Sequence, residues 1–509
     1  MSTNEVSSPE YSAAGTTAQK MSLPMLTAMV VGSMVGSGVF MLPRRFGDHA
    51  GIFGALVAWG IAGGGMFMLA RVFQSVAERK PELDSGVFAY AKAGFGNYAG
   101  FFAALGYWAG TAIGNVSYFV LIMSTVGLIK ITVIPPSVPI GHGDYESGMR
   151  TTIFGEGDTL WAVAISSVIV WAVHYLILRG VKQAAFINTI ATVAKIVPIV
   201  LFLVFVAFGI QADIFAANFW GGEEATFANI YGQARGVMGV TLFVFLGVEG
   251  ASVYSRYAKK RSDVGTATVF GFLGVLCLFM LITILSYGVM LKPELTQVAQ
   301  PSMAGVLAHV VGPWGTVFIG IGLIISVTGA YLSWCLLAAE VLYSAGKTEN
   351  MPKLLARENT QNVPSAALWM TNIVTQFFLI TTLFSADALR LMVDLTGAVN
   401  LIPYLTVAAY GLKLAWTRET YDARPQGRTA DLIQSAIATV YTAWLIYALG
   451  LKFLLLSAII YAPGTALYIW ARREQKQRVF TTVKLGLFIV AAVAAIVAVV
   501  MLATGYLTL

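Results

Sequence analysis

Two glycine-containing segments place backbone groups without helical partners inside apolar stretches of the chain. The first runs from Gly36 to Gly38, and the second runs from Gly247 to Gly250. A bilayer core offers no water to free N–H and C=O groups, so such a break persists where it lines a cavity that a ligand can fill. The N–H groups after the first break favour a carboxylate, because they begin a half-helix. The carbonyls before the second break, at Leu246, favour an ammonium group.

Two charged residues lie at the depth of these breaks. Glu249 belongs to the second break, and Lys195 lies near the middle of an apolar run over 184–210. A charge inside a membrane is costly and typical of a functional site, so Glu249 is expected to pair with a cation or to change protonation. Lys195 is expected to stand where a sodium ion would otherwise bind and to tie its helix to the first break. The alternatives are a buried structural acid for Glu249 and snorkelling to an interface for Lys195.

Aromatic side chains flank the same segments: Tyr107, Trp108, Phe243, Trp334 and Tyr404. An aromatic face can hold a guanidinium or ammonium group through a cation–π contact worth about 0.5 to 2 kcal/mol. Each of these residues taken alone also fits a place in the hydrophobic core.

The composition indicates how these residues are positioned. Of 509 residues 57% are hydrophobic and only 11% are charged, which predicts an all-α integral membrane protein embedded in a lipid bilayer. Runs of about 20 apolar residues, each long enough to cross a bilayer as a helix, recur along the chain. We predict about 13 transmembrane helices, near 23–43, 51–73, 96–128, 159–178, 184–210, 227–255, 264–290, 312–342, 365–385, 389–412, 431–449, 451–471 and 482–505.

The net charge of +7 is spread over short connections, which indicates membrane topology and not nucleic-acid binding. Connections rich in Lys and Arg alternate with connections poor in them, and the basic set is expected to face the cytoplasm. This places the N-terminus inside and the C-terminus outside. Residues 1–22 are expected to form a cytoplasmic tail, and the chain shows no metal-ligand or cofactor motif.

The spacing of the two breaks predicts an internal repeat. They fall in the first and sixth predicted helices, and a period of five helices inverts the second copy across the membrane. We therefore expect a LeuT-like 5+5 inverted repeat with discontinuous helices 1 and 6, made of residues 23–210 and 227–412. Three further helices over 413–509 are expected to scaffold the fold or to form contacts in a homodimer. Close helix packing through small residues is the alternative reading of either glycine segment.

Several motifs resemble those of the basic amino acid/polyamine antiporters of the APC superfamily. Further segments resemble its arginine/ornithine antiporter branch, which has thirteen helices. The first set comprises residues 36–43 (GSGVFMLP), 88–91 (FAYA), 107–108 with 114–115, 245–252 (FLGVEGAS), 334–338 and 403–405. The second set comprises residues 72–74, 79–84 (RKPELD), 114–121 (GNVSYFVL), 260–265 (KRSDVG) and 337–342.

The resemblance implies roles for substrate-binding residues at matching positions. Ser37 and Gly38 would bind the substrate carboxylate, while the Leu246 carbonyl and Asn115 would hold the amino group and polar head. The positions that match contacts to the cationic tail are Gly110, Thr111, Trp334 and Thr396, with Trp334 stacking on it.

The resemblance also implies a polar gate made of Tyr107, Glu249 and Tyr404. Lys195 matches a lysine found in sodium-independent members of the superfamily. Two positions depart from the arginine/agmatine relative, since Phe243 replaces a stacking tryptophan and Thr111 replaces a cysteine. Both changes keep a pocket compatible with a cation but weaken the case for agmatine as the partner substrate.

The sequence thus predicts a secondary active transporter, not an enzyme, that exchanges small cationic amino acids in a bacterial cytoplasmic membrane. Arginine uptake for ornithine export is the leading expectation. Lysine/cadaverine and arginine/agmatine exchange remain open, as do a membrane-embedded enzyme that uses Glu249 as a general base and a receptor that binds without transport.

Overall fold

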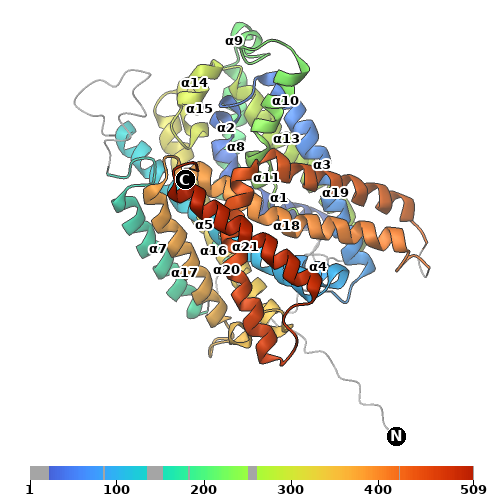
Figure 1. The fold of residues 1–509 in the computed structure, drawn as a ribbon. Helices are drawn as coiled ribbons and strands as arrows, with labels where there is room; N and C mark the ends of the chain where they lie inside the picture. Colours follow the sequence, from blue (N-terminus) through green and yellow to red (C-terminus); the bar gives the residue numbers. More distant parts are fainter. Residues whose placement is uncertain are drawn as a thin grey trace.

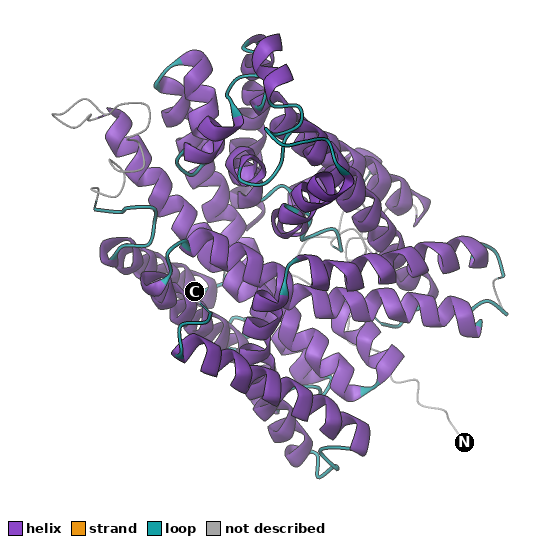
Figure 2. Cartoon of the chain, turned by 45° about the horizontal axis from the view of Figure 1, so that its top comes forward, coloured by secondary structure: helices purple, strands orange, loops and turns teal. Residues whose placement is uncertain are grey.

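The computed structural model describes residues 22–83, 86–133, 153–180, 184–249, 261–422 and 425–507. All regular secondary structure within these ranges is helical (Figures 1 and 2). The bilayer core offers no hydrogen-bond partners to backbone N–H and C=O groups. Such an apolar chain is therefore expected to form helices, which satisfy these groups internally. The predicted tail over 1–22 lies outside the described residues, apart from Ser22.

The described residues form α-helices and short 3₁₀ segments. Short 3₁₀ segments occur at Ser37–Met41 (η1), Lys353–Ala356 (η3) and Thr382–Phe384 (η4). The α-helices are α1 (Leu23–Met34), α2 (Leu42–Gly47), α3 (Ile52–Arg79), α4 (Val87–Phe95), α5 (Asn97–Val133), α7 (Leu160–Leu178), α8 (Ala184–Phe208), α9 (Ala212–Ala217), α10 (Phe227–Gly236), α11 (Met238–Val244), α13 (Arg261–Ser286), α14 (Lys292–Gln297), α15 (Ser302–Val311), α16 (Trp314–Lys347), α17 (Ser365–Thr381), α18 (Ala388–Thr417), α19 (Arg428–Ala448), α20 (Leu451–Glu474) and α21 (Thr482–Ala503).

Within the described residues, ten helices are long and apolar enough to cross a membrane, or eleven if the bent pair around the first break is one span. These eleven correspond to eleven of the predicted spans. The other two predictions fall on α19, a helix of 21 residues, and on 227–255, which continues beyond the described residues after Glu249. The chain is therefore an all-helical multi-pass membrane protein.

The first break appears where the sequence predicts it. Helix α1 ends at Met34, Val35 and Gly36 leave the helical conformation, and η1 and α2 continue the span at an angle of 51°. The residues of η1 are all buried. The second break follows α11, where residues 245–249 form turns and Gly247 has a φ of +102°.

The centre of the molecule is formed by long helices from both halves of the chain. Helix α5 packs along α16 and α18, α16 packs on α8, and α1 packs on α13. Helix α21, drawn in dark red in Figure 1, has few buried residues and exposes its valines and isoleucines, which suits contact with lipid. The core therefore lies around the two breaks and the outer helices shield it.

Candidate functional site

The two helix breaks meet each other in the structure. The Ser33 hydroxyl at the end of α1 donates a hydrogen bond of 3.1 Å to the Gly247 carbonyl. A side chain at Gly247 would collide with the Ser33 carbonyl, and one at Gly38 would press on Phe243 and Val244. The glycines therefore permit both the left-handed backbone at Gly247 and the close approach of two segments more than 200 residues apart.

A cavity lies at this junction, between the two breaks and the helices α5, α16 and α18. All twelve residues expected to bind substrate or to gate its path line the cavity: Ser37, Gly38, Tyr107, Gly110, Thr111, Asn115, Phe243, Leu246, Glu249, Trp334, Thr396 and Tyr404.

Polar atoms without partners mark one part of the cavity. The Ser37 hydroxyl, both side-chain polar atoms of Asn115 and the Thr396 hydroxyl are buried and have no hydrogen-bond partner in the structure. An unpaired buried polar group costs about 1–3 kcal/mol, so native proteins rarely leave several of them together. This cluster is suited to a polar ligand that supplies the missing partners.

Glu249 forms the other part of the cavity wall, where its carboxylate is well supplied with donors. The Tyr107 and Tyr404 hydroxyls donate to its two oxygens at 2.6 and 2.7 Å, and the Gly247 N–H donates at 3.2 Å. Tyr107 belongs to α5 and Tyr404 to α18, so one carboxylate joins the second break to two long helices. The predicted polar gate is thus assembled as a hydrogen-bonded unit.

Lys195 of α8 contacts the first break but does not line the cavity. Its Nζ donates to the carbonyls of Gly32 and Val35 at 3.1 and 2.9 Å, and the residue is 5% exposed. Carbonyls at the end of a helix lack helical partners and carry partial negative charge, so a cation is favoured there. This is the tie between α8 and the first break that the sequence predicts.

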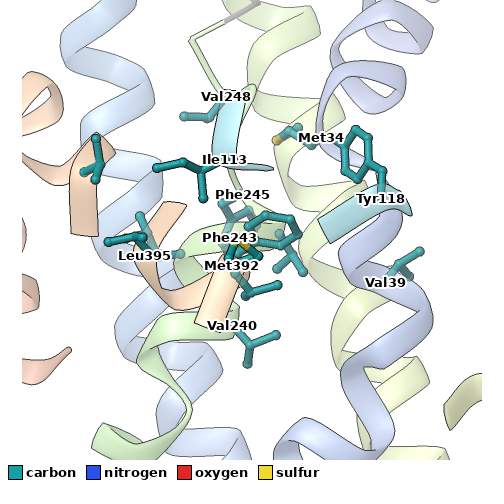
Figure 3. Packing of buried hydrophobic residues seen from close by; sticks show 14 of the residues in the cluster. Met34, Val39, Ile113, Tyr118, Val240, Phe243, Phe245, Val248, Met392 and Leu395 are labelled. Atoms are coloured by element: carbon teal, nitrogen blue, oxygen red, sulfur yellow. The ribbon is translucent and has the colours of Figure 1, made fainter. Parts of the chain in front are cut away.

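Apolar residues from several elements enclose the polar atoms. Figure 3 shows Val39 of η1, Ile113 and Tyr118 of α5, and Phe243 of α11 with Met392 of α18 in this packing. Phe243 is 7% exposed and lies on the cavity wall, while Trp334 is partly buried on the same wall. Apolar and aromatic side chains therefore form much of the pocket wall beside the polar atoms.

Gly36 of the predicted first break also lines the cavity, together with six residues that were not predicted from the sequence: Ser33, Met34, Gly114, Tyr118, Val244 and Asn400. Most of them adjoin predicted residues within a break or one helical turn away. Asn400 could have been predicted to line the cavity, because it lies four residues after Thr396 and four before Tyr404 on one helix face. No group of three His, Cys, Asp or Glu side chains suited to a metal ion occurs in the part of the chain that the structure describes.

Comparison with known proteins identifies the family. Residues 21–464 match the amino acid permease family. An arginine/ornithine antiporter of Pseudomonas aeruginosa is 47% identical over 96% of this chain and 99% of its own length. An L-lysine transport protein of Corynebacterium glutamicum is 38% identical over 97% and 98% of the two chains, and an arginine/agmatine antiporter of Chlamydia abortus is 34% identical over 88% and 89%. The chain is therefore a transporter of the amino acid permease family and not an enzyme.

Proposed function

We propose that this transporter exchanges cationic amino acids by alternating access, taking up arginine and exporting ornithine. The observation that carries the proposal is the cavity at the two breaks, which combines unpaired groups around Ser37 with an acid at Glu249. An amino acid with a basic side chain has a carboxylate, an ammonium and a second cation to place. The 47% identity to an arginine/ornithine antiporter over nearly the full chain supports the same pair of substrates.

We assign the substrate carboxylate to the N–H groups and hydroxyl at Ser37 and Gly38, and the amino group to the Leu246 carbonyl and Asn115. The cationic tail then extends along Gly110, Thr111, Trp334 and Thr396, with Phe243 closing the pocket. A cation near Glu249 offsets part of the cost of burying its carboxylate. Tyr107 and Tyr404 would release Glu249 when this side of the pocket opens.

The order of the helices supports an inverted repeat of residues 23–210 and 227–412. Four candidate spans lie between the two breaks, namely α3, α5, α7 and α8, and the first four after the second break are α13, α16, α17 and α18. The second long span of each set is preceded by a short helix that ends at a glycine with positive φ. These are α4 with Gly96 at +86° and α15 with Gly312 at +89°.

The basic connections support an orientation with the N-terminus in the cytoplasm. Arg79, Lys347, Lys353 and Arg472 lie on connections or helix ends that the positive-inside rule assigns to one side. We propose residence in a bacterial cytoplasmic membrane, with the helices over 413–509 scaffolding the repeats or forming a homodimer.

Counterflow in proteoliposomes tests the exchange. Purified protein is reconstituted with internal ornithine, and uptake of labelled external arginine is followed over time. We expect rapid uptake that disappears when internal ornithine is omitted. Uptake of equal rate and extent from empty vesicles would contradict exchange, and saturable arginine binding without any counterflow would favour a receptor.

Lysine is the second candidate substrate, because a lysine transport protein is 38% identical over 97% of this chain. The same vesicles, loaded in turn with lysine, cadaverine, agmatine or ornithine, separate the alternatives. Exchange of arginine with agmatine at the ornithine rate would widen the proposed pair to include decarboxylated products.

A further inference from the structure

Asn400 lies on the cavity wall between residues with predicted roles. It is 2% exposed and is one turn of α18 after Thr396 and one turn before Tyr404. Residues four apart share one face of a helix, so α18 presents three polar side chains in a row to the cavity. The row runs from the unpaired atoms near the first break towards Glu249.

The carboxamide of Asn400 is held in one orientation. Its Nδ2 donates a hydrogen bond of 2.8 Å to the Thr396 carbonyl, which identifies this atom as the nitrogen. On the opposite side a Cβ at Gly110 of α5 would collide with Nδ2 and lie 2.8 Å from Cγ of Asn400. Gly110 and Asn400 are therefore complementary, because only a glycine leaves room for this amide between the two helices.

The remaining polar atom of Asn400 is an acceptor. No described residue donates a hydrogen bond to Oδ1 of Asn400, although the side chain lines the cavity. The neighbouring Thr111 hydroxyl already donates to the Tyr107 carbonyl at 2.8 Å, so towards a ligand it too offers lone pairs. This stretch of the wall consequently presents acceptors that suit a group rich in N–H donors.

We propose that Asn400 selects the charged end of the substrate side chain, with Oδ1 accepting an N–H from its guanidinium or ammonium group. The assignment rests on the proposed function, since it places the tail of a cationic amino acid between α5 and α18. A guanidinium has five N–H donors and no acceptor, so a desolvated tail needs such oxygens. A neutral tail with a carbonyl at the same place would instead meet lone pairs and be rejected.

Ligand pairs of nearly equal shape test this assignment. Equilibrium binding to purified protein is measured for arginine against citrulline, and for ornithine against norleucine, by competition with labelled arginine. In Asn400→Leu we expect the preference for the charged member of each pair to fall about tenfold to a hundredfold, the value of a hydrogen bond to a charged group. Asn400→Asp should increase both preferences.

General structural damage away from the cavity should give a different result. Asn372→Leu is the control for such damage. Asn372 is fully buried, accepts from the Tyr331 hydroxyl at 2.9 Å and does not line the cavity. Its loss should weaken all four ligands by one common factor. The same uniform weakening in Asn400→Leu, or unchanged preferences in it, would overturn the assignment.

A second variant approaches the same contact from α5, which covers the case in which Asn400→Leu does not fold. Gly110→Ala displaces the Asn400 amide and should reduce the same preferences while Asn400 is still present. Unchanged preferences in folded Gly110→Ala would also contradict the assignment. Failure of the proposed exchange is seen separately, since wild-type protein would then bind arginine selectively without counterflow.

Discussion

The guanidinium of Arg45 lies 3.0 Å from the carboxylate of Asp394, and both side chains are less than 10% exposed. This ion pair joins α2, the second half of the broken span, to α18 just before Thr396. Glu249 joins α18 to the second break through Tyr404 at 2.7 Å. Helix α18 is therefore held by one buried charged contact on each side of the cavity.

We predict that Asp394→Asn destabilises the protein by about 3 kcal/mol, because it leaves the Arg45 charge buried without its partner. The double variant Arg45→Met/Asp394→Asn should lose less stability than Asp394→Asn, since it removes the unpaired charge as well. Thermal unfolding in detergent measures both. A loss in the double variant that equals or exceeds that of Asp394→Asn would contradict this account, because the unpaired Arg45 charge would then not be the cause of the destabilisation.

Much of the site was predictable because its signals are local in the sequence. A glycine run inside an apolar stretch, or a lone acid such as Glu249, is visible without knowing what surrounds it. The Arg45–Asp394 pair was not predicted, since its members are 349 residues apart and neither stands out among the many charges at helix ends. The fit of Asn400 to Gly110 likewise depends on how α5 and α18 pack.

Helix lengths illustrate a second limit. The span predicted over 96–128 is a helix from Asn97 to Val133, and the one predicted over 312–342 runs from Trp314 to Lys347. Hydropathy measures the part of a helix that suits lipid, whereas the hydrogen-bonded helix continues into polar residues. Lys130 and Lys347 extend these helices beyond the apolar run, because a helix end tolerates a basic residue near its last carbonyls.

Glu249→Gln should reduce exchange about tenfold to a hundredfold while the protein still folds. A carboxamide can accept from Tyr107 or Tyr404 but lacks the charge that strengthens both hydrogen bonds, each worth about 1.5–3 kcal/mol. Counterflow rates and a gel-filtration profile measure the two effects. Tyr107→Phe and Tyr404→Phe should each lose less exchange activity than Glu249→Gln. A fully active Glu249→Gln variant would remove the acid from the mechanism.

Lys195→Met should lower both the melting temperature and the exchange rate. The substitution keeps the apolar stem but leaves the Gly32 and Val35 carbonyls at the first break without their donor. The sequence predicts that the Lys195 ammonium stands where a sodium ion would otherwise bind, so wild-type exchange should be equal in sodium and choline buffers. A strong sodium requirement in wild-type protein would contradict this role, whatever the variant does.

We predict that His49 makes the protein less stable in acid. It lies between α2 and α3, where the Arg390 guanidinium approaches its Nε2 at 3.2 Å. Burial first, and then the positive charges of Arg390, Arg45 and Lys292, lower the pKa of His49 from 6.5 to about 4. The unfolded chain therefore binds more protons between pH 6.5 and 4, so the contribution of neutral His49 to stability is present above this window and is lost as the pH falls through it.

Melting temperatures in detergent between pH 7 and 4 measure this effect. His49→Gln keeps a polar side chain but cannot titrate, so its melting temperature should fall less steeply across the window than that of wild-type protein. His309→Gln, on the exposed side of α15, is the matched control and should retain the wild-type slope. Parallel curves for wild-type protein and His49→Gln would mean that groups other than His49 govern the acid sensitivity.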